Sequence, residues 1–160
     1  IAYLVSPFLT QRIAAYHYAM LAAGITPSPA WMRHARGEPD RCYREIAHET
    51  VCRWLREDWK KSGCTALLTQ NDEAALGAIQ AFREAKIDVP KEVSVIGFDG
   101  TEVSEYSTPR LTTVELPMQE IGAGGVELLL KQIREEPVKL ATLVLPVGLK
   151  IRESTAPTGA

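Results

Sequence analysis

The sequence lacks the cysteine patterns that build disulfide frameworks or zinc sites. Its three cysteines, Cys42, Cys52 and Cys64, are odd in number and form no Cys-x-x-Cys pair. Its three histidines show no metal-ligand spacing with them, so we expect neither disulfides nor a bound metal. Reduced thiols are typical of the cytoplasm, and we therefore expect a cytoplasmic protein.

An excess of basic residues is also missing. Lysine and arginine number 18 and aspartate and glutamate 20, which gives a formal net charge of -2. This balance makes the chain by itself a poor candidate for binding DNA or an anionic membrane, and any DNA contact would come from elsewhere. No apolar run approaches the roughly 20 residues that cross a bilayer, so no membrane partner is expected. No leader-like segment opens the sequence either.

Signatures of catalysis are absent as well. The sequence contains no glycine-rich phosphate loop, no nucleophile elbow and no recognisable Ser-His-Asp or Cys-His arrangement. We therefore expect a protein that is not an enzyme and that needs no cofactor. An enzyme of flavodoxin-like architecture, with Asp99 as nucleophile or base, is the alternative.

The sequence does contain a regular alternation of short apolar runs and helical patterns. Its 160 residues, 46% of them apolar and 24% charged, are enough to bury one core. Continuous apolar runs separated by amphipathic helices predict an open parallel α/β sheet with helices on both faces. Strands are expected at 1–5, 30–35, 66–68, 93–98, 111–115, 140–145 and 147–151, helices at 11–23, 41–61, 72–86 and 121–134, and irregular chain at 36–40 and 101–109.

Three polar residues follow predicted strands, at the edge of the sheet where α/β proteins bind ligands. Arg12 lies in the first turn of a helix, where the helix dipole disfavours a cation, while Asn71 and Asp99 come just after strands. Each has an ordinary alternative, since Arg12 could be a solvated surface residue and Asp99 part of an Asp-Gly turn. Asp72, beside them, is expected to serve mainly as the N-cap of the helix 72–86.

Several motifs, kept in order and spacing, resemble the effector-binding domain of the LacI/GalR (lac repressor/galactose repressor) family of bacterial transcriptional regulators. The resemblance covers nearly everything after Cys64, and Arg12 begins a thinner match in which Ala15 replaces a glycine of the family pattern. The motifs are Asn71-Asp72-x-Ala-Ala-Leu-Gly, Val89-Pro90, Val93-Ser94-Val95-Ile96-Gly97-Phe98-Asp99, Pro109-Arg110-Leu111-Thr112-Thr113-Val114 and Arg152-Glu153-Ser154-Thr155.

The resemblance implies a periplasmic-binding-protein-like fold, in which two α/β subdomains close on a sugar or similar small effector. Residues 1–116 and 146–155 would form mainly the C-terminal subdomain, and 117–145 the crossover with part of the N-terminal subdomain. The N-terminal DNA-binding domain of the family would be absent. The first residue already begins a strand-like run, so we expect a part of a longer protein.

The resemblance also implies where the effector binds. The effector contacts of the family correspond to Arg12, Asn71 and Asp99. Met118 lies at the crossover, where it would supply an apolar wall. A guanidinium fork, an amide and a carboxylate can together read neighbouring hydroxyl groups.

The helix predicted at 72–86 carries more apolar surface than one stripe facing a sheet requires. By resemblance it forms part of a two-fold subunit interface, with Leu76, Ala75 and Ile79 as the expected contacts of a homodimer. A monomer that buries these residues against its own sheet is the alternative. The sequence thus favours the ligand-sensing, dimerising domain of a transcriptional regulator, with a transport-type periplasmic sugar-binding protein as the second candidate.

Overall fold

The computed structural model describes residues 1–35, 40–137 and 142–157. Its centre is a six-stranded sheet in the order β2-β1-β3-β4-β5-β6, in which only β6 runs antiparallel to its neighbour. The predicted parallel α/β sheet is thereby confirmed. The strands are β1 Ala2–Val5, β2 Met32–His34, β3 Ala66–Thr69, β4 Ser94–Asp99, β5 Thr112–Glu115 and β6 Gly148–Lys150; the α-helices are α1 Thr10–Ala22, α2 Tyr43–Glu57, α3 Trp59–Ser62, α4 Asp72–Glu84, α5 Val103–Tyr106 and α6 Met118–Ile133, with a 3-10 helix η1 at Pro29–Trp31.

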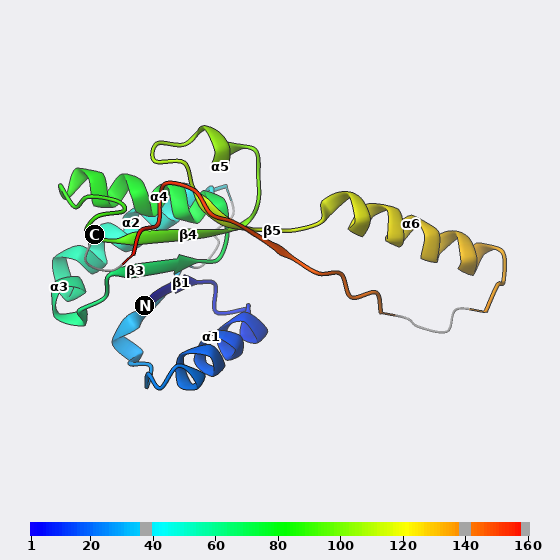
Figure 1. Cartoon of the computed structure of the whole chain (residues 1–160), viewed down its shortest axis with the longest axis horizontal. Coiled ribbons are helices and arrows are strands. Elements are labelled where there is room, and N and C mark those ends of the chain that lie inside the picture. The colour runs from blue at the N-terminus through cyan, green and yellow to red at the C-terminus, as the bar shows by residue number, and fades with distance from the viewer. Residues whose placement is uncertain (36–39, 138–141, 158–160) are drawn as a thin grey trace.

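Helices cover both faces of the sheet, α1 on one and α2, α3 and α4 on the other (Figure 1). Side chains alternate between the two faces of a strand, so β1 contributes to two cores. Ala2 and Leu4 join the larger cluster under α2 and α4, while Tyr3 and Val5 pack with Tyr16 of α1. This double burial explains the continuous apolar run of β1.

Close packing between α2 and α4 depends on Gly77. A Cβ atom at this position would lie 2.1 Å from the backbone oxygen of Arg44, so any larger residue would push the helices apart. Trp54, Trp59 and Phe82 fill the space below as a chain of aromatic contacts, with ring centroids 4.9 and 5.1 Å apart. The aromatic residues of this region therefore belong to the core.

Several predicted boundaries need correction. The single helix expected at 41–61 is two helices, because the backbone breaks at Asp58 between α2 and α3. The segment 101–109, expected to be irregular, contains α5. The strand expected at 140–145 does not form over residues 142–145, whereas 140 and 141, like most of the loop predicted at 36–40, lie outside the described residues.

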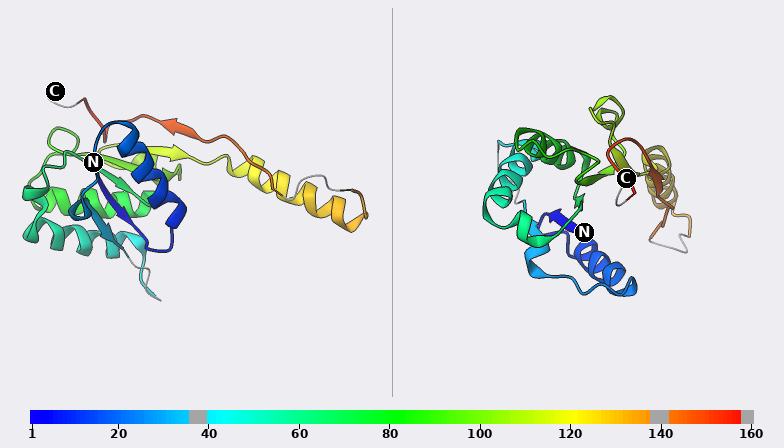
Figure 2. Two further views of the ribbon diagram at one scale, coloured as in Figure 1. Left: turned by 90° about the horizontal axis from the view of Figure 1, so that it is seen from below. Right: turned by 60° about the vertical axis from the view of Figure 1, so that its left-hand side comes forward.

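The molecule divides into a body and an arm. We call residues 1–35, 40–115 and 148–157 the body, and residues 116–137 and 142–147 the arm. Figures 1 and 2 show the arm, mostly α6, projecting from the end of the sheet before the chain returns through β6. None of the residues of α6 is buried. None of the helices described is long and apolar enough to span a membrane.

Candidate functional site

Arg12, Asn71 and Asp99 lie at one edge of the sheet, which we call the polar edge. β1, β3 and β4 are parallel neighbours, so their carboxyl ends meet there. Arg12, on the helix after β1, donates a hydrogen bond from Nη1 to the backbone oxygen of Gln70 at 2.7 Å. Its guanidinium also lies 3.8 Å from the ring centroid of Phe98. Because Gln70 and Phe98 immediately precede the other two residues, Arg12 connects both strand ends.

The Asp99 carboxylate has no hydrogen-bond partner among the described residues and is free to accept one. Its burial, and then the nearby carboxylate of Asp72, raise the pKa of Asp99, while the charge of Arg12 partly offsets this rise. The backbone of Asp99 has a φ of 110°, and Gly100 follows with a φ of 73°. The chain therefore turns at Asp99 and Gly100, which agrees with the Asp-Gly turn given above as the alternative role of Asp99. The turn leaves an unpaired acceptor at the sheet edge.

Asn71 is the N-cap of α4. Its Oδ1 accepts a hydrogen bond from the backbone amide of Ala74 at 2.8 Å, so the expectation that Asp72 caps this helix was wrong. The cap uses the amide oxygen and leaves Nδ2 as a donor without a protein partner among the described residues. Asn71 can thus donate to a ligand but has less acceptor capacity than a free amide would have.

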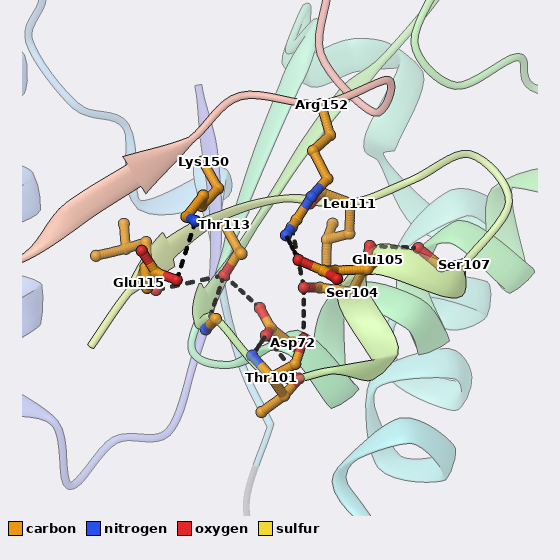
Figure 3. Close-up of polar contacts among 12 residues, drawn as sticks. Asp72, Thr101, Ser104, Glu105, Ser107, Leu111, Thr113, Glu115, Lys150 and Arg152 are labelled. Atoms are coloured by element: carbon orange, nitrogen blue, oxygen red, sulfur yellow. Dashed lines mark hydrogen bonds and ion pairs between the residues drawn. The ribbon is translucent and has the colours of Figure 1, made fainter. Parts of the chain in front are cut away.

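Asp72 is fully buried and joins α4 to the chain beyond β4. Its carboxylate accepts hydrogen bonds from the amide and hydroxyl of Thr101, both at 2.7 Å, and from the hydroxyl of Thr113 (Figure 3). Gly97 makes room for it, since a Cβ there would lie 2.3 Å from Asp72 Oδ1. This network fixes the loop that follows Asp99. Sequence reasoning missed it, although an acidic residue, a strand glycine and a strand threonine were all visible.

Arg152 binds the C-terminal segment to the rest of the body. Its guanidinium donates to the Ser104 hydroxyl at 3.0 Å, to the Leu111 backbone oxygen at 2.8 Å and to Glu105 at 2.9 Å (Figure 3). Ser154, which is fully buried, bridges β4 and β5 through its hydroxyl. The Arg-Glu-Ser-Thr motif therefore has a structural role and lies apart from the polar edge.

Gln70, which directly follows β3, is a further residue of the polar edge. It is buried, and its Oε1 accepts a hydrogen bond from the backbone amide of Ser6. Its Nε2 is buried and has no partner within the described residues. An unpaired donor beside Arg12 and Asn71 adds to the polar groups collected there.

Met118 does not join these residues. It is the first residue of α6, is 64% exposed, and lines a separate hollow of about 410 Å³ with Gly100, Glu115 and Pro146. Its expected effector contact stays a prediction.

The expected interface residues of α4 differ in exposure. Ala75 is fully buried and Ile79 is 3% exposed, so both belong to the core of the body. Leu76 is half-buried and, with Ile79, lines a groove of about 640 Å³ between α4 and α5 that includes none of the polar-edge residues. A contact with a second subunit would therefore depend mainly on Leu76.

The chain resembles known proteins along almost its whole length. Residues 1–155 match the family model described as periplasmic binding protein-like domain. The chain is 32% identical to catabolite control protein A of Priestia megaterium over 145 residues, which cover 91% of this chain and 41% of the relative.

Two solved structures add ligands to this comparison. The complex of the transcriptional regulator CelR with cellobiose has a TM-score of 0.83 and 25% identity, covering 96% of this chain and 46% of CelR. The LacI-family regulator of Arthrobacter sp. FB24 in complex with lactose has a TM-score of 0.80 and 27% identity, covering 97% and 56%. The chain thus spans about half the length of the proteins it matches.

Proposed function

The chain belongs to the LacI/GalR family of transcriptional regulators, and from this we propose that it is the effector-sensing and pairing domain of such a regulator. In this proposal the DNA-binding domain lies outside these 160 residues, and the protein acts in the cytoplasm, where its operator is. In this proposal the domain binds an effector and transmits the binding to the DNA-binding domain, and it catalyses no reaction. The net charge of -2 supports the assignment of DNA contacts to another domain.

The polar edge of the sheet carries the proposal. Arg12 offers guanidinium donors, Asn71 offers Nδ2, and Asp99 offers an unpaired carboxylate. Neighbouring hydroxyl groups of a sugar match this set, because each hydroxyl can both donate to a carboxylate and accept from an amide or guanidinium. One relative was solved with cellobiose and another with lactose, and both sugars are rich in such hydroxyl groups. We therefore propose a sugar or sugar derivative as the effector.

The family assignment also suggests how the chain divides into subdomains. We propose that 1–116 and 146–155 form one half of an effector cleft, and that 117–145 lead into the other half. α6 then packs on that second half, which explains its exposed apolar side chains. Closure of the two halves would bring Met118 toward the effector. We further propose that two copies pair through the groove at Leu76, in a two-fold contact.

A calorimetric experiment tests the effector site. The longest natural chain that contains these residues is titrated with cellobiose, lactose and their component sugars. Asp99→Asn should weaken binding of the active sugar by about 1.5–3 kcal/mol, the range for hydrogen bonds to charged groups. Asp88→Asn is the matched control, because Asp88 is near the amino end of β4, at the opposite edge of the sheet. Unchanged affinity in Asp99→Asn would rule out Asp99 as a contact.

A further inference from the structure

Three side chains with different metal-binding atoms meet where α2 contacts α4. His48 and Cys52 are on α2, and Glu84 is the last residue of α4. His48 Nε2 lies 2.8 Å from Glu84 Oε2 and 3.6 Å from Cys52 Sγ. The three ligand atoms all lie within 4.8 Å of one another. None of these residues belongs to the polar edge.

The backbone holds this cluster in place. His48 and Cys52 are four positions apart, so they lie on the same face of α2, one turn from each other. The close approach of the two helices at Gly77 fixes the distance from α2 to Glu84. Gln80 donates a hydrogen bond to Glu84 Oε1 at 3.0 Å, which orients the carboxylate and directs Oε2 toward His48. Such a second layer of hydrogen bonds is usual around metal ligands.

The set of donor atoms selects the ion. Imidazole nitrogen, thiolate sulfur and carboxylate oxygen are the three ligand types of zinc sites, whereas calcium and magnesium sites use oxygen alone. At ordinary zinc bond lengths a tetrahedral ion holds its ligand atoms about 3.3–3.7 Å apart. Nε2 of His48 and Sγ of Cys52 already have this spacing at 3.6 Å, whereas Nε2 of His48 and Oε2 of Glu84, 2.8 Å apart, must separate by at least about 0.5 Å.

We propose that His48, Cys52 and Glu84 bind one Zn²⁺ ion, with water as the fourth ligand. His48 and Cys52 are half-buried and Glu84 is exposed, so the ion would be reachable from solvent and would keep an open position. Binding releases the thiol proton of Cys52 to solvent and joins the two helices. In the absence of the ion, the contact between His48 and Glu84 is an ordinary hydrogen bond.

This site differs from the sequence expectation, which found no metal-ligand spacing among cysteines and histidines. His48 and Cys52 are four positions apart within the predicted helix, a spacing that places both side chains on one face. Glu84 could not be found from the sequence, because it comes from a different helix and is brought near by the packing of α2 on α4.

Cobalt, a spectroscopic substitute for zinc, gives the first test. We expect titration of the reduced wild-type chain with Co²⁺ to produce a thiolate-to-cobalt charge-transfer band and the visible bands of a tetrahedral ion, saturating at one ion per chain and lost when Zn²⁺ is added. Cys52→Ser should abolish the charge-transfer band. Cys42→Ser is the matched control, because Cys42 is the exposed cysteine at the N-cap of the same helix, and it should keep the band.

The other two ligands are tested by competition for Zn²⁺ with a chromophoric chelator. His48→Asn and Glu84→Gln should each weaken binding at least about tenfold. His17→Asn, at an exposed histidine of α1, should change nothing. Zn²⁺ should also protect Cys52 of the wild-type chain from alkylation, a result that requires no variant to fold. A wild-type chain without the thiolate band, a band that survives in Cys52→Ser, or an unprotected Cys52 would overturn the proposal.

Discussion

The helices α4 and α6 share a helical spacing of apolar residues but differ in burial. Both repeat alanine, leucine, isoleucine or valine at helical spacing, and both were predicted as helices on that basis. Eight of the 13 residues of α4 are buried, whereas none of the 16 residues of α6 is. Helical periodicity thus predicts that a helix forms and which side is apolar, but the partner decides whether that side is covered.

The glycines of the two helices show the same difference. Gly77 of α4 is required, because a Cβ would run into the backbone of Arg44. At Gly122 and Gly125 of α6 a Cβ would meet no atom of the described residues within 4 Å. Glycine costs about 1 kcal/mol in a helix relative to alanine, so these two weaken α6 without a packing gain from the described residues. This difference supports the proposal that α6 packs on another part of the regulator.

The largest expected difference between body and arm is in stability. Leu67 is 1% exposed in β3 and Leu129 is 56% exposed in α6, so Leu67→Ala and Leu129→Ala remove the same atoms from opposite surroundings. We expect Leu67→Ala to lower the free energy of unfolding by about 2–5 kcal/mol. Leu129→Ala should stay within about 0.5 kcal/mol of the wild type, since alanine is as good a helix former.

Urea unfolding followed by tryptophan fluorescence measures both variants, because Trp31, Trp54 and Trp59 all lie in the body. A large loss in Leu129→Ala would mean that the arm packs against the body in solution, and the distinction between the two regions would fail.

A second difference concerns association. Leu76 lines the groove of the body and Leu129 lies on the apolar side of the arm. Leu76→Arg should weaken pairing more than about tenfold, since it places a charge in the proposed contact, near Arg44 and Arg83. Leu129→Arg should leave pairing unchanged. Both leucines are partly exposed, so we expect both variants to fold.

Analytical ultracentrifugation of the wild type and the two variants measures this pairing. If Leu129→Arg separates the subunits and Leu76→Arg does not, the copies associate through the arm, and the groove is not the interface.

The sequence predicted the features that depend on local pattern. The apolar runs and helical periodicity located most elements, and residues that follow strands were expected at one edge because parallel strands share that edge. Arg12, Asn71 and Asp99 lie where this argument placed them. Whether they bind an effector stays a prediction.

Features that depend on tertiary packing were missed. Asp72 looked like a helix cap, yet its partners Thr101 and Thr113 come from later segments, and only the folded sheet brings them together. The break at Asp58 within a continuous helical pattern was missed as well. The Asp72 network depends on contacts between residues that are distant in sequence, which one-dimensional periodicity does not contain.

The smallest expected effect links the polar edge to stability. Burial and the Asp72 carboxylate raise the pKa of Asp99 in the folded state. In the unfolded chain the carboxyl group of Asp99 has a lower pKa and therefore loses its proton at lower pH than in the folded chain. Ionisation of Asp99 thus favours unfolding as the pH rises through the unfolded-state and folded-state pKa values. Asp99→Asn should stabilise the fold at about pH 7, and the gain should shrink as the pH falls toward about 4, near the ordinary aspartate pKa. The same variant should weaken effector binding.

Urea unfolding at several pH values measures this gain, with Asp40→Asn as the control. Asp40 also has a positive φ, of 68°, and is exposed. Asp40→Asn therefore measures how replacing a carboxylate by an amide affects stability at a backbone with positive φ when the side chain is not buried. A functional carboxylate that destabilises its own fold is expected at a binding site, where an unpaired acceptor is kept for the ligand. If Asp99→Asn instead lowers stability at about pH 7, the carboxylate has a partner within the fold, and its assignment to the effector fails.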